Sequence, residues 1–216
     1  RQPRATETVD SMIRIICRLI ESEHAYPADN GDVYYSVKSF AEYGKLSGRK
    51  VEDLRAGERV AVDESKRDPL DFVLWKSSKP DERSWPSPWG EGRPGWHIEC
   101  SAMSMDLLGD EFDIHGGGMD LIFPHHEAEI AQSHASNKCM PVNYWMHNNM
   151  ITVDGKKMGK SLGNFMNLED FFSGNHEKLS KAYSPMTIRF FILQAHYRST
   201  LDFGNDALQA AEKGMH

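Results

Sequence analysis

Residues 112–129 read Phe-Asp-Ile-His-Gly-Gly-Gly-Met-Asp-Leu-Ile-Phe-Pro-His-His-Glu-Ala-Glu. The stretch starts with a short strand-like run over 112–115, continues through a predicted glycine turn and enters a helix near Pro124. A helix is predicted before it, over 97–108, and strand-like patches follow over 142–153. Strand, glycine turn, helix and strand form the order of an α/β sheet that binds its ligand at the strand ends.

The flanking sequence predicts further short elements. They are a helix over 6–23, a hairpin over 26–37, strands at 60–62 and 70–75, an irregular segment over 77–95 and helices over 168–172, 186–194 and 207–213. Within the hairpin, Asn30-Gly31 is typical of a type I′ turn.

Composition narrows the class of protein. Of the 216 residues 39% are hydrophobic, which is enough for a core. No apolar run reaches the roughly 18 residues of a membrane span, and we expect no membrane contact. Three scattered cysteines indicate a reducing cytoplasm without a disulfide framework. The formal net charge of −7 argues against an overall basic surface for nucleic acid, but it does not exclude binding through a local basic patch.

A glycine-flanked loop with two lysines follows the predicted strands. It reads Lys157-Met158-Gly159-Lys160-Ser161. A mobile loop of this kind can close over a polyphosphate and neutralise charge that develops in a transition state. The loop therefore predicts a nucleotide-activating enzyme, with Lys157 and Lys160 as its catalytic cations.

The helix after Pro124 presents metal-ligating side chains. His125 and Glu129 are four residues apart and share one helix face, and Cys100 can join them from the preceding helix. Sulfur, nitrogen and oxygen donors together suit zinc. Spacing alone also permits His126 and Glu127 as the inward pair, or an ordinary surface helix.

The glycines before this helix favour close approach of a ligand to the backbone. Asp120 follows them and can accept hydrogen bonds from ribose hydroxyls; a tight crossover is the alternative. Trp96, beside His97, is a candidate wall of a small substrate pocket, or else a hydrophobic plug. We assign Trp145 to the core.

Taken in order, these motifs resemble cysteinyl-tRNA synthetases over essentially the whole chain. The resemblance rests on residues 4–7, 28–33, 68–76, 94–103 and 115–127, and the lysine loop resembles the Lys-Met-Ser-Lys-Ser motif of class I synthetases. It implies an incomplete class I Rossmann-like nucleotide fold. Its parts are a connective insertion subdomain over 1–94, the second half of the catalytic fold over 95–165 and a helical segment over 166–216.

The resemblance also implies an activity. ATP, with Mg²⁺, activates L-cysteine to cysteinyl-adenylate, and the cysteinyl group then passes to the 3′ end of tRNA(Cys). We expect a cytoplasmic monomer. In this family a zinc ion binds the substrate thiolate.

The resemblance implies roles for the residues of this chain that match the family's motifs. Cys100, His125 and Glu129 match three of the four zinc ligands, and Trp96 and His115 match residues beside the bound cysteine. Gly117, Gly118 and Asp120 match the nucleotide side, together with Lys157, Met158, Gly159, Lys160 and Ser161 of the lysine loop.

Some features depart from the family pattern. The Cys-Gly-Pro-Thr-like segment with the fourth zinc ligand, the His-Ile-Gly-His motif and the anticodon domain do not occur in the sequence. We therefore expect an internal fragment that is inactive alone. Gly159 stands where the motif has serine, and the segment 173–185 is longer than usual. A related cysteine–amino-sugar ligase and a non-catalytic zinc- or nucleotide-binding module remain alternatives.

Overall fold

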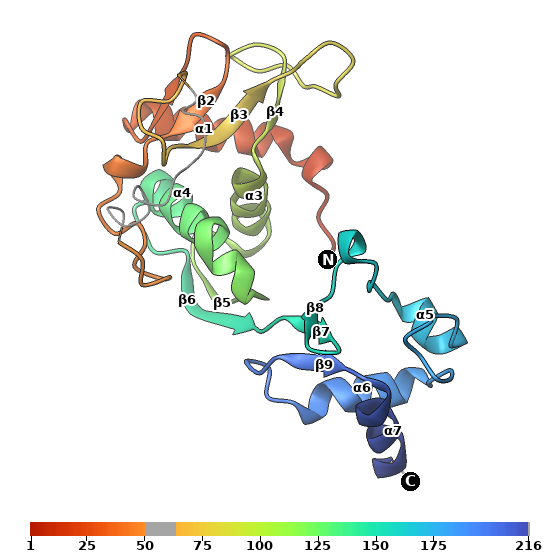
Figure 1. Ribbon diagram of the computed structural model, residues 1–216. Coiled ribbons are helices and arrows are strands. Elements are labelled where there is room, and N and C mark those ends of the chain that lie inside the picture. Colours follow the sequence, from red (N-terminus) through yellow and green to blue (C-terminus); the bar gives the residue numbers. More distant parts are fainter. Residues whose placement is uncertain (51–63, 216) are drawn as a thin grey trace. The chain divides into compact units, whose positions relative to one another are not determined.

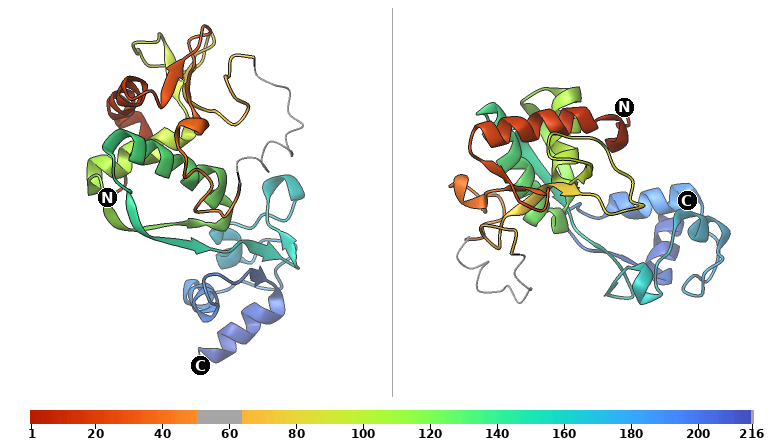
Figure 2. Two further views of the ribbon diagram at one scale, coloured as in Figure 1. Left: turned by 90° about the vertical axis from the view of Figure 1, so that its left-hand side faces the viewer. Right: turned by 90° about the horizontal axis from the view of Figure 1, so that it is seen from above.

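The computed structural model describes residues 1–50 and 64–215, so the strand predicted at 60–62 lies outside the described part. The chain forms two compact units (Figures 1 and 2). Unit 1 comprises Arg1–His115 and Leu121–Trp145, and unit 2 comprises Gly116–Asp120 and Met146–His216. The mixed α/β class is confirmed. The three-part division at 94 and 165 stays a prediction.

Unit 1 contains a four-stranded antiparallel sheet. Its strands, in spatial order, are β1 (Ala25–Pro27), β2 (Val33–Tyr35), β3 (Phe72–Ser77) and β4 (Gly92–Pro94). The predicted hairpin is confirmed as β1 and β2, which pair from Ala25↔Tyr35 to Pro27↔Val33. Its type I′ turn is wrong, because among the connecting residues only Gly31 has a positive φ. The Asn30 side chain instead accepts a hydrogen bond from the Asp32 N–H and shapes the turn locally.

Sequence analysis missed β4 inside the proline-rich segment. The strand pairs with β3 from Trp75↔Pro94 to Ser77↔Gly92. A Cβ on Gly92 would lie 2.3 Å from the Trp75 Nε1 atom, so this close pairing needs glycine. Such a contact between distant residues leaves no periodic signal in the sequence.

Among the described residues, unit 1 contains three α-helices. They are α1 (Val9–Glu21), α3 (Trp96–Leu108) and α4 (Glu127–Asn137), which pack against one another (Figures 1 and 2). A short 3₁₀ helix (Ala5–Glu7) precedes α1. The apolar stripe of α1 is buried with Leu74 and Trp75 of β3 and Ile98 of α3 in one core. Burial of this stripe, rather than helix propensity, stabilises α1. No described helix is both long and apolar enough to cross a membrane.

The predicted glycine turn is wrong. Gly116 to Gly118 continue a strand, β5 (Phe112–Gly118), which pairs with β6 (Val142–Asn148). None of the three glycines has a positive φ, and the chain turns only afterwards, in a 3₁₀ helix (Met119–Leu121). Pairing with a distant strand keeps the glycines extended, which a local composition rule does not register.

Unit 2 holds a three-stranded sheet in the order β8 (Lys156–Lys157), β7 (Ile151–Val153), β9 (Leu201–Phe203). The pair β7–β9 is parallel, and β9 was not predicted. The predicted C-terminal helices are confirmed as α5 (Leu168–Ser173), α6 (Pro185–Gln194) and α7 (Asn205–Gly214). A second core joins the helices to the sheet, with Val153, Phe171, Ile188, Phe203 and Leu208 among its members.

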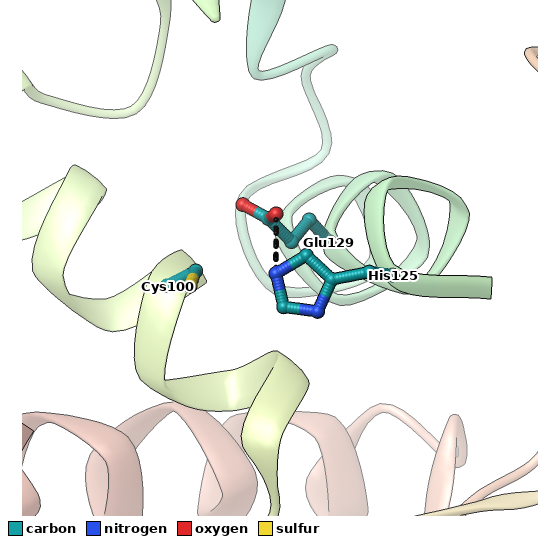
Figure 3. A group of neighbouring side chains, drawn as sticks. All are labelled: Cys100, His125 and Glu129. Carbon is teal, nitrogen blue, oxygen red and sulfur yellow. Dashed lines mark ion pairs between the residues drawn. The ribbon is translucent and has the colours of Figure 1, made fainter. Parts of the chain in front are cut away.

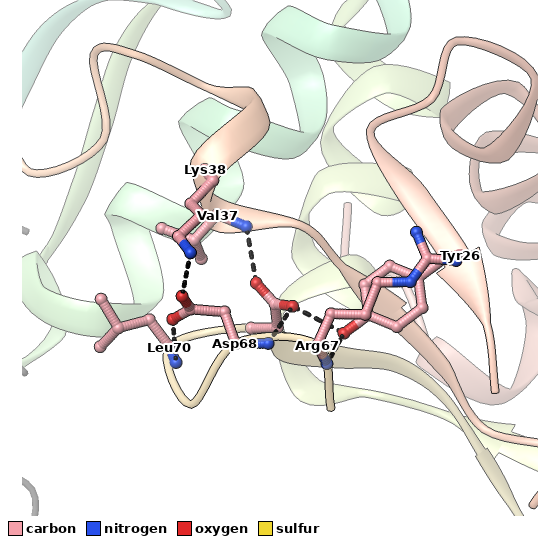
Figure 4. A network of polar contacts seen from close by, with 7 residues as sticks. Tyr26, Val37, Lys38, Arg67, Asp68 and Leu70 are labelled. Atoms are coloured by element: carbon pink, nitrogen blue, oxygen red, sulfur yellow. Dashed lines mark hydrogen bonds and ion pairs between the residues drawn. The ribbon is translucent and has the colours of Figure 1, made fainter. Parts of the chain in front are cut away.

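A buried carboxylate ties the start of β3 to the rest of unit 1 (Figure 4). Asp71 is 1% exposed and accepts hydrogen bonds from the Val37 N–H, the Asp68 N–H and the Tyr26 hydroxyl. Burial and the bond to Asp71 raise the pKa of the Tyr26 phenol, so Tyr26 remains a donor. The network fixes the position at which β3 begins. Helix α3 contacts this strand.

We predict that Asp71→Ala lowers the free energy of unfolding by roughly 3–5 kcal/mol, because three donors lose a charged acceptor in a buried place. Tyr26→Phe removes part of the network and is expected to cost about 1–2 kcal/mol. Urea unfolding followed by circular dichroism measures both values. Equal, small losses for the two variants would contradict this account of β3.

Candidate functional site

Three potential metal ligands converge in unit 1 (Figure 3). Cys100 comes from α3, His125 from a π-helical turn (Ile122–His126), and Glu129 from the first turn of α4. One ligand atom from each residue lies within 4.8 Å of the others. The His125 Nε2 and Glu129 Oε1 atoms are 3.1 Å apart. The geometry groups Cys100 with His125, the histidine that spacing alone did not single out.

The electrostatics of this group fit a cation. Glu129 is 3% exposed, and its Oε1 atom is buried without a donor in hydrogen-bond geometry, although the His125 Nε2 atom lies 3.1 Å away. A buried carboxylate oxygen left without a donor is costly unless a positive charge faces it. Burial, helped by Glu129 and Glu99, raises the pKa of the Cys100 thiol to about 12. A metal ion that binds here therefore displaces a proton from Cys100.

A second histidine orients His125. The Nδ1 atoms of His97 and His125 are 2.8 Å apart, so one ring donates its N–H to the other. Burial, reinforced by His125, lowers the pKa of His97 to about 4, which keeps that ring neutral. When His125 is the donor, its Nε2 atom, which lies 3.1 Å from Glu129 Oε1, carries the lone pair. A contact of this kind is the outer hydrogen bond that orients an imidazole in metal sites. Sequence analysis had named His97 only as the neighbour of Trp96.

A competing group shares Glu129. The Nε2 atoms of His115 and His126 lie 3.7 Å and 4.0 Å from the same Oε1 atom, and the three residues form a second set of possible ligands. Both sets therefore share one carboxylate. Only the set with Cys100 provides the thiolate that a thiophilic ion such as Zn²⁺ favours.

Aromatic rings surround the two sets. The Trp96 ring centroid is 4.4 Å from that of His125, and Trp96 is 59% exposed, so it is not a hydrophobic plug. Trp145 stacks on His115 at 4.6 Å and lies 4.8 Å from His126, a contact that its assignment to the core had missed. A cavity of about 620 Å³ opens beside Cys100 and His115. Its volume and largely apolar lining suit a small ligand.

The lysine loop belongs to unit 2. Asp154 and Gly155, both at positive φ, form a tight turn between β7 and β8, and the loop begins where β8 ends. Met158 packs on the second core, while Lys157 and Lys160 are exposed. A 3₁₀ helix (Lys160–Leu162) follows. The core thus anchors the loop at Met158 and leaves both ammonium groups available to an anion.

Asn164 closes the base of this loop. Its Oδ1 atom accepts from the Gly159 N–H, and its Nδ2 atom donates to the Lys157 carbonyl, both at 3.0 Å. The Asn164 side chain thereby makes the hydrogen bonds that a neighbouring strand would otherwise make to the loop backbone. Sequence analysis missed Asn164, and its position beside Gly163, which is left-handed with φ 67, is the only local signal.

The glycine within the loop is not required by its backbone. Gly159 has an extended conformation, with φ −167 and ψ 145, which any residue adopts. A Cβ there would lie 3.7 Å from Leu162 Cδ1, an ordinary contact. The serine of the class I motif therefore fits at this position without strain.

The remaining predicted nucleotide residues also lie in unit 2. Gly117 and Gly118 end β5, and Asp120 is exposed in the 3₁₀ helix that follows. A Cβ on Gly118 would lie 2.3 Å from the Asp120 Oδ1 atom, so glycine permits this approach of the carboxylate to the backbone. Asp120 can accept hydrogen bonds from a ligand there.

Comparison with known families decides the relationship. A model described as "tRNA synthetases class I (C) catalytic domain" matches residues 1–213. The chain belongs to this family. The predicted fold class and family are confirmed.

Curated relatives agree with the family. Proteins named cysteine–tRNA ligase from Methylobacillus flagellatus and Dichelobacter nodosus are 61% and 59% identical over 214 residues, 99% of this chain. The chain spans 45% of the length of each. Among solved structures, a "putative arginyl t-RNA synthetase" from Campylobacter jejuni matches 95% of this chain and 35% of its own, with a TM-score of 0.49 and 15% identity.

We predict that Cys100 in the metal-free protein reacts increasingly fast with iodoacetamide as the pH rises from 8 to 11. Its raised pKa keeps the thiolate a minor species over this range, and that fraction grows about tenfold per pH unit. Mass spectrometry of the Cys100 peptide measures the rate. A plateau near pH 9, the value of an ordinary thiol, would refute the effect of burial.

We predict that Asn164→Ala speeds hydrogen exchange of the Gly159 amide about tenfold, because one net hydrogen bond contributes roughly 1–1.5 kcal/mol. NMR exchange rates provide the measurement. Asn164→Asp is the comparison variant, since it keeps the acceptor for Gly159 and replaces the donor to Lys157 with a carboxylate oxygen. Unchanged exchange in Asn164→Ala would show that the side chain does not hold the loop.

Proposed function

We propose that the full-length product of this gene is a cysteine–tRNA ligase. It forms cysteinyl-adenylate from L-cysteine and ATP with release of pyrophosphate, and then transfers the cysteinyl group to tRNA(Cys) with release of AMP. The convergence of Cys100, His125 and Glu129 beside an open cavity carries the proposal. The matched family and the names of the relatives support it.

These residues suit a zinc ion that recognises the substrate. Cys100 Sγ, His125 Nε2 and Glu129 Oε1 would hold it, and His97 would keep the imidazole of His125 in the ligating tautomer. Zinc bound there supplies a site that prefers a thiolate to a hydroxyl, which separates cysteine from serine where shape alone separates them poorly. Trp96 and His115 stand beside this group and would border the bound amino acid.

Residues of unit 2 would bind the nucleotide. Lys157 and Lys160 would neutralise the phosphates of ATP, with Mg²⁺, as charge develops at the α-phosphate. Met158, Gly159 and Ser161 would supply the loop backbone around them. Gly117 and Gly118 would permit close approach of the nucleotide, and Asp120 would accept hydrogen bonds from the ribose. A cytoplasmic, monomeric enzyme remains our expectation.

The test is pyrophosphate exchange into ATP by the full-length gene product, with cysteine and with serine. We expect exchange with cysteine alone, and Lys160→Ala is expected to lower it about 10²–10³-fold, as loss of a charge-stabilising contact does in other enzymes. Lys156→Ala is the matched control, because Lys156 is an exposed neighbour in β8 outside the proposed site, and its rate is expected to stay unchanged.

Two outcomes of the exchange assay would contradict the proposal. The first is exchange that depends on another amino acid. The second is full activity of Lys160→Ala. Charging of tRNA(Cys) by the same preparation completes the test, since formation of the adenylate without transfer to tRNA would place the protein in another class of ligase.

A further inference from the structure

The turn that presents His125 is not a regular helix. Phe123 within it has non-helical angles, φ −134 and ψ 131, and the regular hydrogen-bond pattern of α4 starts only at Glu127. Helical geometry alone therefore does not fix the direction of His125 relative to Glu129. Contacts from outside the helix have to supply that constraint.

Glu127 receives such contacts. It is fully buried at 0% exposure, and both carboxylate oxygens accept hydrogen bonds. Oε2 accepts from the Gly44 N–H at 3.0 Å, and Oε1 accepts from the Ser47 N–H at 2.7 Å and the Ser47 hydroxyl at 2.9 Å. Gly44 adopts φ +96, and a Cβ on it would lie 2.1 Å from the Arg49 carbonyl oxygen, so the donors sit in a tightly built loop.

The same loop also holds the other side of the turn. The Arg49 guanidinium lies 4.6 Å from the centroid of the Phe123 ring, and the Tyr43 ring meets Phe123 edge-on at 6.2 Å. Phe123 precedes His125 and Glu127 follows it. The segment from Tyr43 to Arg49 thus contacts the chain on both sides of a proposed zinc ligand, although more than 70 residues separate Arg49 from Phe123.

We propose that Glu127 is a positioning residue of the metal site. Its bonds to Gly44 and Ser47, with the packing of Phe123, set the direction in which His125 and Glu129 face Cys100. This inference rests on the proposed zinc role of those three residues. It adds that the segment from Tyr43 to Arg49, which lies about 80 residues away in the sequence, determines how tightly these three residues bind the metal ion.

The experiment titrates Co²⁺ into the metal-free full-length gene product and records the thiolate-to-cobalt charge-transfer band and the visible d–d bands. We expect Glu127→Gln, which keeps the shape and removes the charge, to weaken Co²⁺ binding about 10-fold, within the range known for outer-shell partners of metal ligands. Its d–d bands are expected to change in shape. Ser47→Ala removes a single donor and is expected to weaken binding about threefold, and it remains informative if Glu127→Gln does not fold.

Glu42→Gln is the matched control. It neutralises a carboxylate beside the same segment, but Glu42 is exposed and pairs with Lys45, so we expect unchanged binding and spectrum. Circular dichroism of each variant checks its fold. If Glu127→Gln and Ser47→Ala fold and retain the unsubstituted affinity and d–d bands, Glu127 is merely structural and the inference is overturned. If the unsubstituted protein lacks the charge-transfer band, the zinc assignment itself fails, and the inference fails with it.

Discussion

A buried carboxylate oxygen with no hydrogen-bond donor is the constraint on which the candidate site depends. The Glu129 Oε1 atom faces His125 at 3.1 Å, while the Cys100 thiol completes the group. Packing of α3 against α4 brings the sulfur to the carboxylate, and the core beneath α1 and β3 holds both helices. The free energy of hydrophobic burial thereby maintains a polar arrangement that is unfavourable by itself until a cation binds.

The two proposed chemical tasks fall on separately built supports. Thiol recognition uses unit 1, where irregular backbone at Phe123 lets His125 approach Glu129. Nucleotide activation uses unit 2, where Met158 anchors the lysine loop to a second core and leaves Lys157 and Lys160 exposed. Each support combines a rigid core with a short irregular segment. Such segments can direct functional groups where regular helices and strands do not.

Local patterns in the sequence predicted much of this structure. The apolar period of α1, the four-residue spacing of His125 and Glu129 and the lysine loop all involve neighbours along the chain. The type I′ turn expected at Asn30-Gly31 was a local error, but several other errors concern distant partners. Gly116 to Gly118 are extended because they pair with β6, and β4 exists because Gly92 permits contact with Trp75. Spacing named Glu127 only as a possible inward partner of His126 and did not indicate its donors, which lie about 80 residues away, and Asn164 was missed. Motif resemblance, not spacing, separated His125 from His126.

X-ray absorption at the zinc edge of the zinc-loaded full-length protein tests the central claim most directly. The account predicts a sulfur scatterer at about 2.3 Å with nitrogen or oxygen scatterers at about 2.0–2.2 Å. Cys100→Ser is expected to reduce the sulfur contribution. A zinc shell of nitrogen and oxygen alone in the unsubstituted protein would place the ion on the set of His115, His126 and Glu129 and would contradict the account.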